Sequence, residues 1–249
     1  GSYTYSVASD WADRPANYVS WGDAARFANW LHNGQPTGDQ DLTTTEDGAY
    51  FLNGATNNAA LMTVSREADW KYAITSEDEW YKAAYYNPAT SSYYDYPTSS
   101  NTTPGYVNNN GNLSTTTGVP FVEGGIDPGN YATYDGMGAS PGIGSPYYRT
   151  EVGEWERSES PYQTFDQGGN VGEWNEAILD GKYRGLRGGS SDYLSAGFDL
   201  QASFREYNYP TVEVHTIGFR VTEVPEPCSM AILALGAVGI LRRRRNVRG

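Results

Sequence analysis

The sequence has a single cysteine, Cys228, and only two histidines, His32 and His215, among its 249 residues. One cysteine excludes an intramolecular disulfide, a cysteine-based zinc site and a cysteine-pair redox centre. Two histidines exclude a metal centre that takes three histidines from one chain. Because lone histidines lack the clustering that metal ligation requires, we expect His32 to be a solvated residue at a helix end and His215 to lie on a loop.

Positive charge is also scarce. The chain has 17 Lys and Arg residues against 30 Asp and Glu residues, a net charge of −13. Five arginines lie in the last eight residues, so residues 1–222 hold 12 basic and 28 acidic side chains, a net charge of −16. Nucleic-acid binding requires a basic face, which this acidic body does not offer. The balance suits metal cations and a secreted, soluble protein.

Tyrosine, glycine and proline are abundant. There are 21 Tyr, 29 Gly and 13 Pro residues, which indicates a loop-rich globular domain rather than a helical bundle. Residues 89–149 are rich in Ser, Thr, Asn, Gly, Pro and Tyr. This composition suits either a low-complexity linker or a long ordered excursion over a compact domain, and the many tyrosines favour the second.

Capping residues and apolar spacing predict two helices. Ser20 suits the N-cap of a helix that starts at Trp21 and ends before Asn33. The apolar positions with helical spacing in it are Ala24, Phe27, Ala28 and Leu31. Ser76 and Glu79 form a capping box for a second helix, whose inner face is Trp80, Ala83 and Ala84 and which ends at Asn87-Pro88. Strands are expected at residues 3–7 and in short pieces from residue 168 onward.

The C-terminal tail has three parts. A Pro-Glu-Pro motif precedes an apolar run of 12 residues from Met230 to Leu241, and four arginines follow. The run is shorter than the about 20 residues of a bilayer-spanning helix. A buried core helix is the plain alternative, but such a helix is rarely apolar on all sides and followed by four arginines. The motif and the basic residues are Pro225, Glu226, Pro227, Arg242, Arg243, Arg244 and Arg245.

In this order the three parts resemble the PEP-CTERM sorting signal of bacterial surface and exopolysaccharide-associated proteins. The resemblance implies recognition by an exosortase, a membrane protease-transpeptidase, and a transient membrane anchor through the C-terminal helix before processing. It also implies export to the cell surface or extracellular matrix, and the positive-inside rule likewise places residues 1–222 outside. We therefore assign residues 223–249 to a sorting signal.

The body carries five groups of motifs in a fixed order. They are Val19-Ser20-Trp21 with Asn29-Trp30-Leu31, then Ser76 to Trp80, Gly169 to Trp174, Leu186 to Ser190, and Gly218-Phe219-Arg220. Together they resemble the formylglycine-generating enzyme family, also called the sulfatase-modifying factor domain. The resemblance implies an α+β fold, a variant of the C-type lectin fold with two helices, small antiparallel sheets and much irregular structure. The family's N-terminal strand region is missing and the first residue is Gly1, so the domain at 1–222 is expected to be N-terminally incomplete.

The family's catalysts oxidise a sulfatase cysteine to formylglycine, using two cysteines that hold copper. Thiolates are the soft ligands that Cu(I) requires. The resemblance, counted back from Pro210, places these two positions on Gly197 and Ala202, neither of which ligates copper. Copper is therefore not expected, and Cys228 lies in the tail. A related branch that makes sulfoxides needs a three-histidine iron, which two histidines do not supply.

The resemblance also implies calcium. Asp166, Gly169, Val171 and Glu173 match a family site in which the two acids give side-chain oxygens and the middle residues give carbonyls. Ca²⁺ takes about 6–8 oxygens, and a glycine-rich turn lets carbonyls point inward. The alternative is an ordinary tight turn with two exposed acids. A second family site is matched by Asn130 and Tyr131.

These features favour an exported, surface-associated, non-catalytic protein that acts as a calcium-stabilised binding or matrix module. Its expected partner is a glycan, a peptide or an envelope component, and the tyrosine-rich segment 81–149 suits such binding. The alternative is an oxidoreductase of the formylglycine-generating type, or another oxidase on the same pocket. Arg187, next to Gly188-Gly189, is expected to pair with a buried carboxylate as a structural residue.

Overall fold

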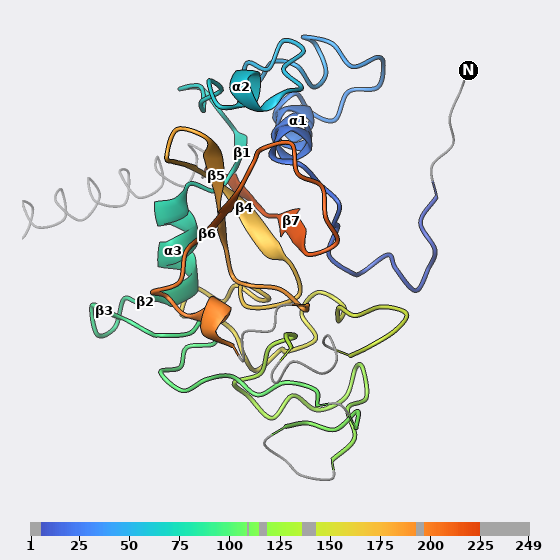
Figure 1. Cartoon of the computed structure of the whole chain (residues 1–249), viewed down its shortest axis with the longest axis vertical. Coiled ribbons are helices and arrows are strands. Elements are labelled where there is room, and N and C mark those ends of the chain that lie inside the picture. Colours follow the sequence, from blue (N-terminus) through green and yellow to red (C-terminus); the bar gives the residue numbers. More distant parts are fainter. Residues whose placement is uncertain (1–5, 109, 115–118, 136–142, 193–196, 225–249) are drawn as a thin grey trace, which may run out of the picture.

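The computed structural model describes residues 6–108, 110–114, 119–135, 143–192 and 197–224 (Figure 1). The strand expected at residues 3–7 falls mostly outside these ranges, and Ser6 and Val7 belong to no strand. The sorting motif from Pro225 onward, with the apolar run, Cys228 and the terminal arginines, lies outside the described residues. No helix in the described ranges has the length and apolar character needed to cross a bilayer.

Both predicted helices are confirmed at their predicted N-caps. Helix α1 (Trp21–His32) starts after Ser20, whose Oγ accepts from the Asp23 N–H, and its C-cap is Asn33. Helix α3 (Glu77–Tyr85) starts with the expected capping box of Ser76 and Glu79. In both helices the N-cap side chain satisfies one of the unpaired N–H groups of the first turn. A single-turn helix α2 (Asn58–Leu61) was not predicted, because four residues carry no periodic pattern.

The inner face of α1 differs from the predicted one. Small residues, together with Trp21, face the core, while Phe27 stays 41% exposed and packs edge-on to Phe219 at 5.4 Å. Small side chains let the helix backbone approach strand β1 (Tyr72–Ile74), and a ring of phenylalanine size has no room there. In α3, Tyr85 is buried with Trp80 and Ala84, and the predicted Ala83 is only half-buried.

The strands form three small sheets. Strand β1 pairs antiparallel with β8 (Val221–Glu223), and β2 (Tyr86–Asn87) pairs with β3 (Ser92–Tyr93). The largest sheet has the order β6-β5-β4-β7, built from β6 (Glu206–Asn208), β5 (Tyr183–Arg187), β4 (Gly172–Leu179) and β7 (Ile217–Phe219). The β4–β7 pair is parallel, a departure from the expected purely antiparallel pairing. The α+β class with few helices, small sheets and much irregular structure is confirmed.

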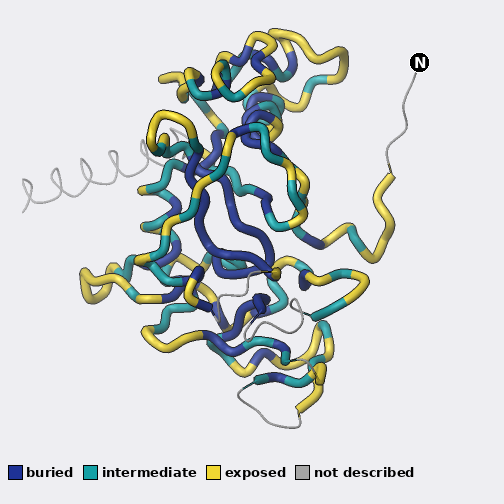
Figure 2. The backbone as a smooth tube through the Cα atoms, in the orientation of Figure 1, coloured by how far each residue is buried: buried dark blue, intermediate teal, exposed yellow. Residues whose placement is uncertain are grey.

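The largest sheet lies at the centre of the molecule and is its most buried part (Figure 2). Helices α1 and α2 cover one end, α3 lies beside the sheet, and the irregular segment between β3 and β4 forms the other end (Figure 1). The described part of that segment has small apolar cores of its own, one around Tyr96 and Tyr134 and one around Tyr131 and Trp155. It is therefore an ordered excursion, as the tyrosine content predicts, and not a linker.

Candidate functional site

The loop that leads into β4 has a backbone that needs glycine. Gly169 has φ of +82°, and a Cβ on it would lie 2.3 Å from the carbonyl oxygen of Thr133. The Asn170 side chain fastens the loop, since its Oδ1 accepts from the Thr150 N–H at 3.0 Å. At the start of the loop, Asp166 Oδ2 accepts from the Gly153 N–H at 2.6 Å. The loop and the excursion therefore hold each other in place.

At the end of this loop, the buried Glu173 carboxylate is bonded at both oxygens. Its Oε1 accepts from Arg220 Nη2 at 2.6 Å, and its Oε2 accepts from Arg220 Nε at 2.5 Å and from the Trp80 indole N–H at 2.6 Å. Arg220 also donates to the Phe165 carbonyl at 3.1 Å. The result is a bidentate ion pair held on one side by an indole.

Three of the five groups of sequence motifs meet in this cluster: Trp80 comes from α3, Glu173 from β4 and Arg220 from the residue after β7. The other two groups bond to the motif that contains Glu173. The Gly188 carbonyl accepts from the Gly169 N–H at 2.8 Å, and the Trp174 indole donates to the Val19 carbonyl at 2.8 Å. These motif residues therefore contribute to the packing of the domain.

Of the two acidic residues expected to bind calcium in this loop, Asp166 has no ion-pair partner within the described part of the chain and Glu173 has one. Burial raises the pKa of the Asp166 carboxyl to about 6, although the Gly153 N–H and the charge of Arg220 act in the opposite direction. Glu173 is different, because Arg220 already supplies the positive charge that a cation would bring. In the ranges given above, no group of three or more His, Cys, Asp or Glu side chains is arranged to hold a metal ion. Calcium binding by Asp166, Gly169, Val171 and Glu173 stays a prediction.

The second expected calcium pair is engaged within the protein. The Asn130 Oδ1 accepts from the Thr98 hydroxyl at 2.6 Å, and its carbonyl accepts from the Gly105 N–H at 2.8 Å. Tyr131 is buried, with its ring 5.3 Å from that of Trp155. These contacts explain the order of the turn by themselves, and a cation at Asn130 also stays a prediction.

Gly197 and Ala202, to which the resemblance assigns the family cysteines, lie on either side of a single 3₁₀ turn, η1 (Phe198–Leu200). Gly197 has φ of +80°, and a Cβ on it would lie 3.0 Å from Thr103 and 3.1 Å from Tyr134. Ala202 packs against the cluster of Trp80 and Tyr85. The backbone at Gly197 has thus taken a conformation that a cysteine adopts only with strain.

Arg187 is a structural residue, as predicted. Its Nη2 donates to Glu77 Oε1 at 2.6 Å, and its Nη1 donates to the carbonyl of Ala202 at 3.0 Å. Arg205 pairs with the other oxygen of Glu77. The two arginines thereby join helix α3 to the segment that follows η1.

An exposed surface around Ala202 was not predicted. Tyr93 is 54% exposed and packs on Tyr81 at 5.4 Å, and Arg187 lies over the Tyr81 ring at 5.2 Å. Arg187 bonds the Phe204 carbonyl, and the Phe204 ring packs edge-on to Phe198 at 5.5 Å. We call this surface the α3 face, made of Tyr81, Tyr93, Phe198, Phe204 and Arg205.

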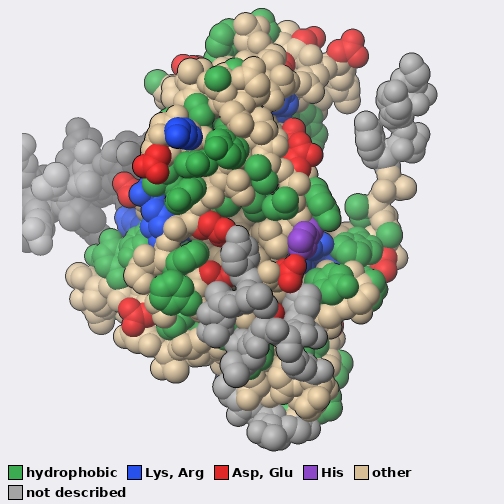
Figure 3. All heavy atoms as spheres, viewed as in Figure 1, with side chains coloured by type: hydrophobic (Ala, Val, Ile, Leu, Met, Phe, Trp, Pro, Cys, Tyr) green, Lys and Arg blue, Asp and Glu red, His purple; other side chains and the backbone are tan. Residues whose placement is uncertain are grey.

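Figure 3 shows hydrophobic and basic side chains side by side over α3 and the adjoining segments. The residues of the α3 face come from four separate stretches of the chain. No spacing rule therefore links them, and only the fold brings them together.

Both histidines lie where expected. His32 is the last residue of α1, and its Nδ1 accepts from the Lys71 N–H at 3.1 Å. His215 is in a turn, with its Nε2 2.7 Å from Asp192 Oδ2. Each histidine has its own local partner.

Comparisons with known proteins agree with this arrangement. The family model of the sulfatase-modifying factor enzyme 1-like domain matches residues 3–224, and the PEP-CTERM protein-sorting motif matches residues 223–245. No curated protein matches the chain.

Two solved structures are similar in fold. Treponema denticola variable protein 1 has a TM-score of 0.51 and 20% identity, over 90% of this chain and 76% of that one. CarF has a TM-score of 0.48 and 18% identity, over 86% and 69% of the two chains. At this identity the likeness to the Treponema denticola protein supports the fold alone.

Proposed function

The chain belongs to the family of sulfatase-modifying factor enzyme 1-like domains, and from that premise we propose that it is a binding member of the family rather than an oxidase. Its PEP-CTERM motif implies export and sorting to the surface or membrane by an exosortase-type system. The proposal is that, once displayed, the domain presents the α3 face to a partner in the cell envelope.

The observation that carries the proposal is the state of the two cysteine positions. Copper chemistry of the family type needs two thiolates at these places. Gly197 and Ala202 have none, and the φ of +80° at Gly197 opposes the return of a cysteine. The remaining members of the motifs pack and pair with one another, as Trp80, Glu173 and Arg220 do.

The α3 face has the chemistry of a protein-binding surface. Aromatic and arginine side chains contribute most to protein interfaces, because each buries a large area with few rotatable bonds. On this face two rings are more than half exposed, Tyr93 at 54% and Phe198 at 55%. The acidic Glu77 beneath pairs with both Arg187 and Arg205, which leaves one net positive charge on the face, carried by the half-exposed Arg205. We therefore assign a peptide or protein segment of the envelope to this face.

Calcium is a second part of the proposal. When bound, the ion would supply positive charge to a half-buried carboxylate whose pKa is raised by burial. Asp166 is that carboxylate, and Gly169 and Val171 follow it in the turn. Glu173 is already paired with Arg220, so the contribution of this chain to a cation rests mainly on Asp166.

The α3 face is tested by binding of the full chain to fractionated cell-envelope proteins. Tyr93→Ala and Phe198→Ala should each weaken retention, whereas Phe51→Ala, a similarly exposed ring at the other end of the molecule, should not. Equal retention of all three variants and the parent chain would remove the face from the proposal.

A further inference from the structure

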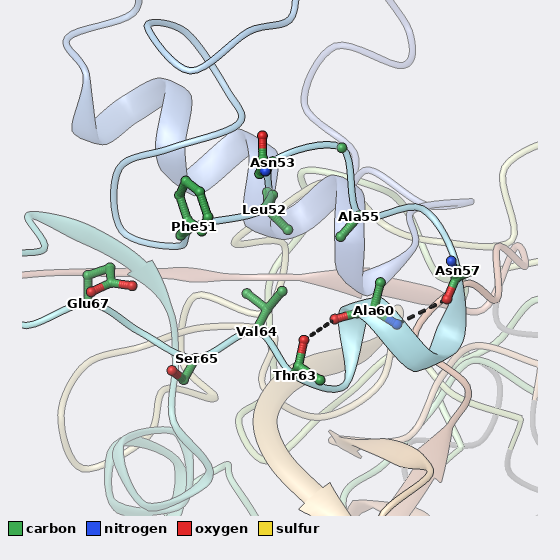
Figure 4. Close-up of a pocket in the computed structure, with 11 residues that line it drawn as sticks. Phe51, Leu52, Asn53, Ala55, Asn57, Ala60, Thr63, Val64, Ser65 and Glu67 are labelled. Carbon is green, nitrogen blue, oxygen red and sulfur yellow. Dashed lines mark hydrogen bonds between the residues drawn. The ribbon is translucent and has the colours of Figure 1, made fainter.

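Three linked hollows lie at the end of the molecule that carries α1 and α2. The first has a volume of about 420 Å³ and lies between residues 51–57 and 60–67 (Figure 4). The second, of about 470 Å³, shares Phe51 and Glu67 with the first. The third, of about 540 Å³, shares His32 and Asn33 with the second. The three hollows therefore adjoin one another, and we call them together the groove; each is of ordinary ligand-pocket size, about 300–1,000 Å³.

The first hollow has an apolar floor and a polar rim. Its floor includes the buried side chains of Leu52 and Val64, and its rim carries Phe51, whose side chain is 50% exposed. Asn53 and Glu67 also line the hollow (Figure 4). Neither side chain forms a hydrogen bond with another residue that the structure describes. The hollow therefore offers an open ring and two unused polar groups to a ligand.

This combination fits a sugar ring. The C–H face of a pyranose packs on an aromatic ring, while its hydroxyls both donate and accept hydrogen bonds. An amide supplies both kinds of partner, and a carboxylate accepts from two neighbouring hydroxyls. Asn53 and Glu67 are both exposed, so each can exchange water for a sugar hydroxyl.

The negative charge around the groove favours neutral sugars over anionic ones. The second hollow adds the carboxylates of Asp47 and Asp69 to that of Glu67. An anionic polysaccharide would be repelled by these groups, whereas a neutral one would not. Several hollows in series accommodate several sugar residues of one chain. We infer that this groove binds a neutral oligosaccharide.

The inference covers binding and no reaction. The groove also has no residue in common with the α3 face, so the inference does not rest on the proposed function.

Titration calorimetry of the full chain with maltohexaose, cellohexaose and laminarihexaose tests the groove, with polygalacturonate as the anionic comparison. At least one neutral hexasaccharide should bind, and polygalacturonate should bind more weakly. Phe51→Ala should raise the Kd about tenfold, the loss expected for one aromatic packing contact. Asn53→Ala should also raise it. Binding of none of the neutral hexasaccharides, or tighter binding of polygalacturonate, would overturn the inference.

Tyr207→Ala is the matched control, since its ring is 48% exposed and lies outside the groove. This variant should bind the hexasaccharide as the parent chain does. An equal loss of affinity in the Phe51 and Tyr207 variants would mean that the sugar binds no particular surface and would also overturn the inference. Failure of the groove leaves envelope binding by the α3 face intact, and failure of that face leaves the groove intact.

Discussion

Arg220 holds Glu173 in a bidentate ion pair, with Nε and Nη2 each donating to a different carboxylate oxygen at 2.5 and 2.6 Å. The pair joins the segment after β7 to the start of β4, and the Trp80 indole adds a third bond from α3. Glu173 was predicted from the sequence as a calcium ligand. In the fold, its charge is balanced by the protein itself.

Removal of Arg220 should destabilise the domain. Arg220→Ala leaves the buried Glu173 carboxylate with only the indole as donor. We expect the free energy of unfolding to fall by about 2–4 kcal/mol, a range that allows for the 25% exposure of the arginine. The control is Arg205→Ala, which breaks the more exposed pair with Glu77 and should cost under about 1 kcal/mol. Chemical denaturation measures both changes. Equal losses of stability would show that the Glu173–Arg220 pair contributes no more than the exposed Glu77–Arg205 pair.

The half-buried Asp166 carboxyl predicts a pH dependence. Its pKa rises from the ordinary 3.8 to about 6 in the folded chain, so the folded state holds the proton more tightly than the unfolded state. In the presence of a chelator, stability should therefore decrease as the pH rises from about 4 to about 6, because the folded state then has to ionise this carboxyl at a cost. Asp166→Asn removes the titration. It should be more stable than the parent chain at pH 7 and similar to it at pH 4, and parallel curves for the two chains would contradict this assignment.

Calcium should act on the same carboxyl in the opposite sense. Adding calcium at pH 7 should raise the Tm of the parent chain, because an ion that binds only the folded state stabilises it. Asp166→Asn should lose this shift while remaining folded. Thermal melts with calcium and with chelator are the measurement, and identical melts of the parent chain in the two conditions would remove calcium from the account.

Gly197 should resist substitution more than a glycine with the same backbone angle and free space. Gly34 also has φ of +80°, but a Cβ on it would have no atom within 4 Å. Gly34→Ala should therefore lower the free energy of unfolding by only about 1–2 kcal/mol, the cost of this backbone conformation for a residue with a side chain. Gly197→Ala adds close contacts with Thr103 and Tyr134, and we expect about 1–3 kcal/mol more. Equal losses of stability in the two variants, measured by denaturation, would mean that Thr103 and Tyr134 move aside for a side chain at this position.

Local signals in the sequence predicted the local structure well. Ser20, Ser76 and Glu79 identified both helix starts, because the hydrogen bonds of an N-cap join residues only three positions apart in the sequence. The inner face of α1 was wrong at Phe27, since spacing identifies apolar residues without telling which of them is small enough for a close approach. The parallel pairing of β4 with β7 depends on the order of strands in the sheet, and spacing along the chain does not encode it.

The candidate site was predictable only where it follows sequence order. Matching the motifs assigns the family cysteine positions to Gly197 and Ala202, which stays a prediction, whereas the structural role of Arg187 was confirmed by its pair with Glu77. The partner of Glu173 was not predictable, because Arg220 lies 47 residues later and the two meet only in the sheet. The same holds for the groove, whose residues Phe51 and Glu67 line two adjoining hollows only in the fold.

The most direct test of a binding role without oxidation is the mass of a sulfatase-type cysteine peptide after incubation in air with the copper-loaded full chain. The absence of thiolates at Gly197 and Ala202 predicts a peptide of unchanged mass that retains its thiol. A peptide that has lost the thiol and carries an aldehyde in its place would contradict the proposal.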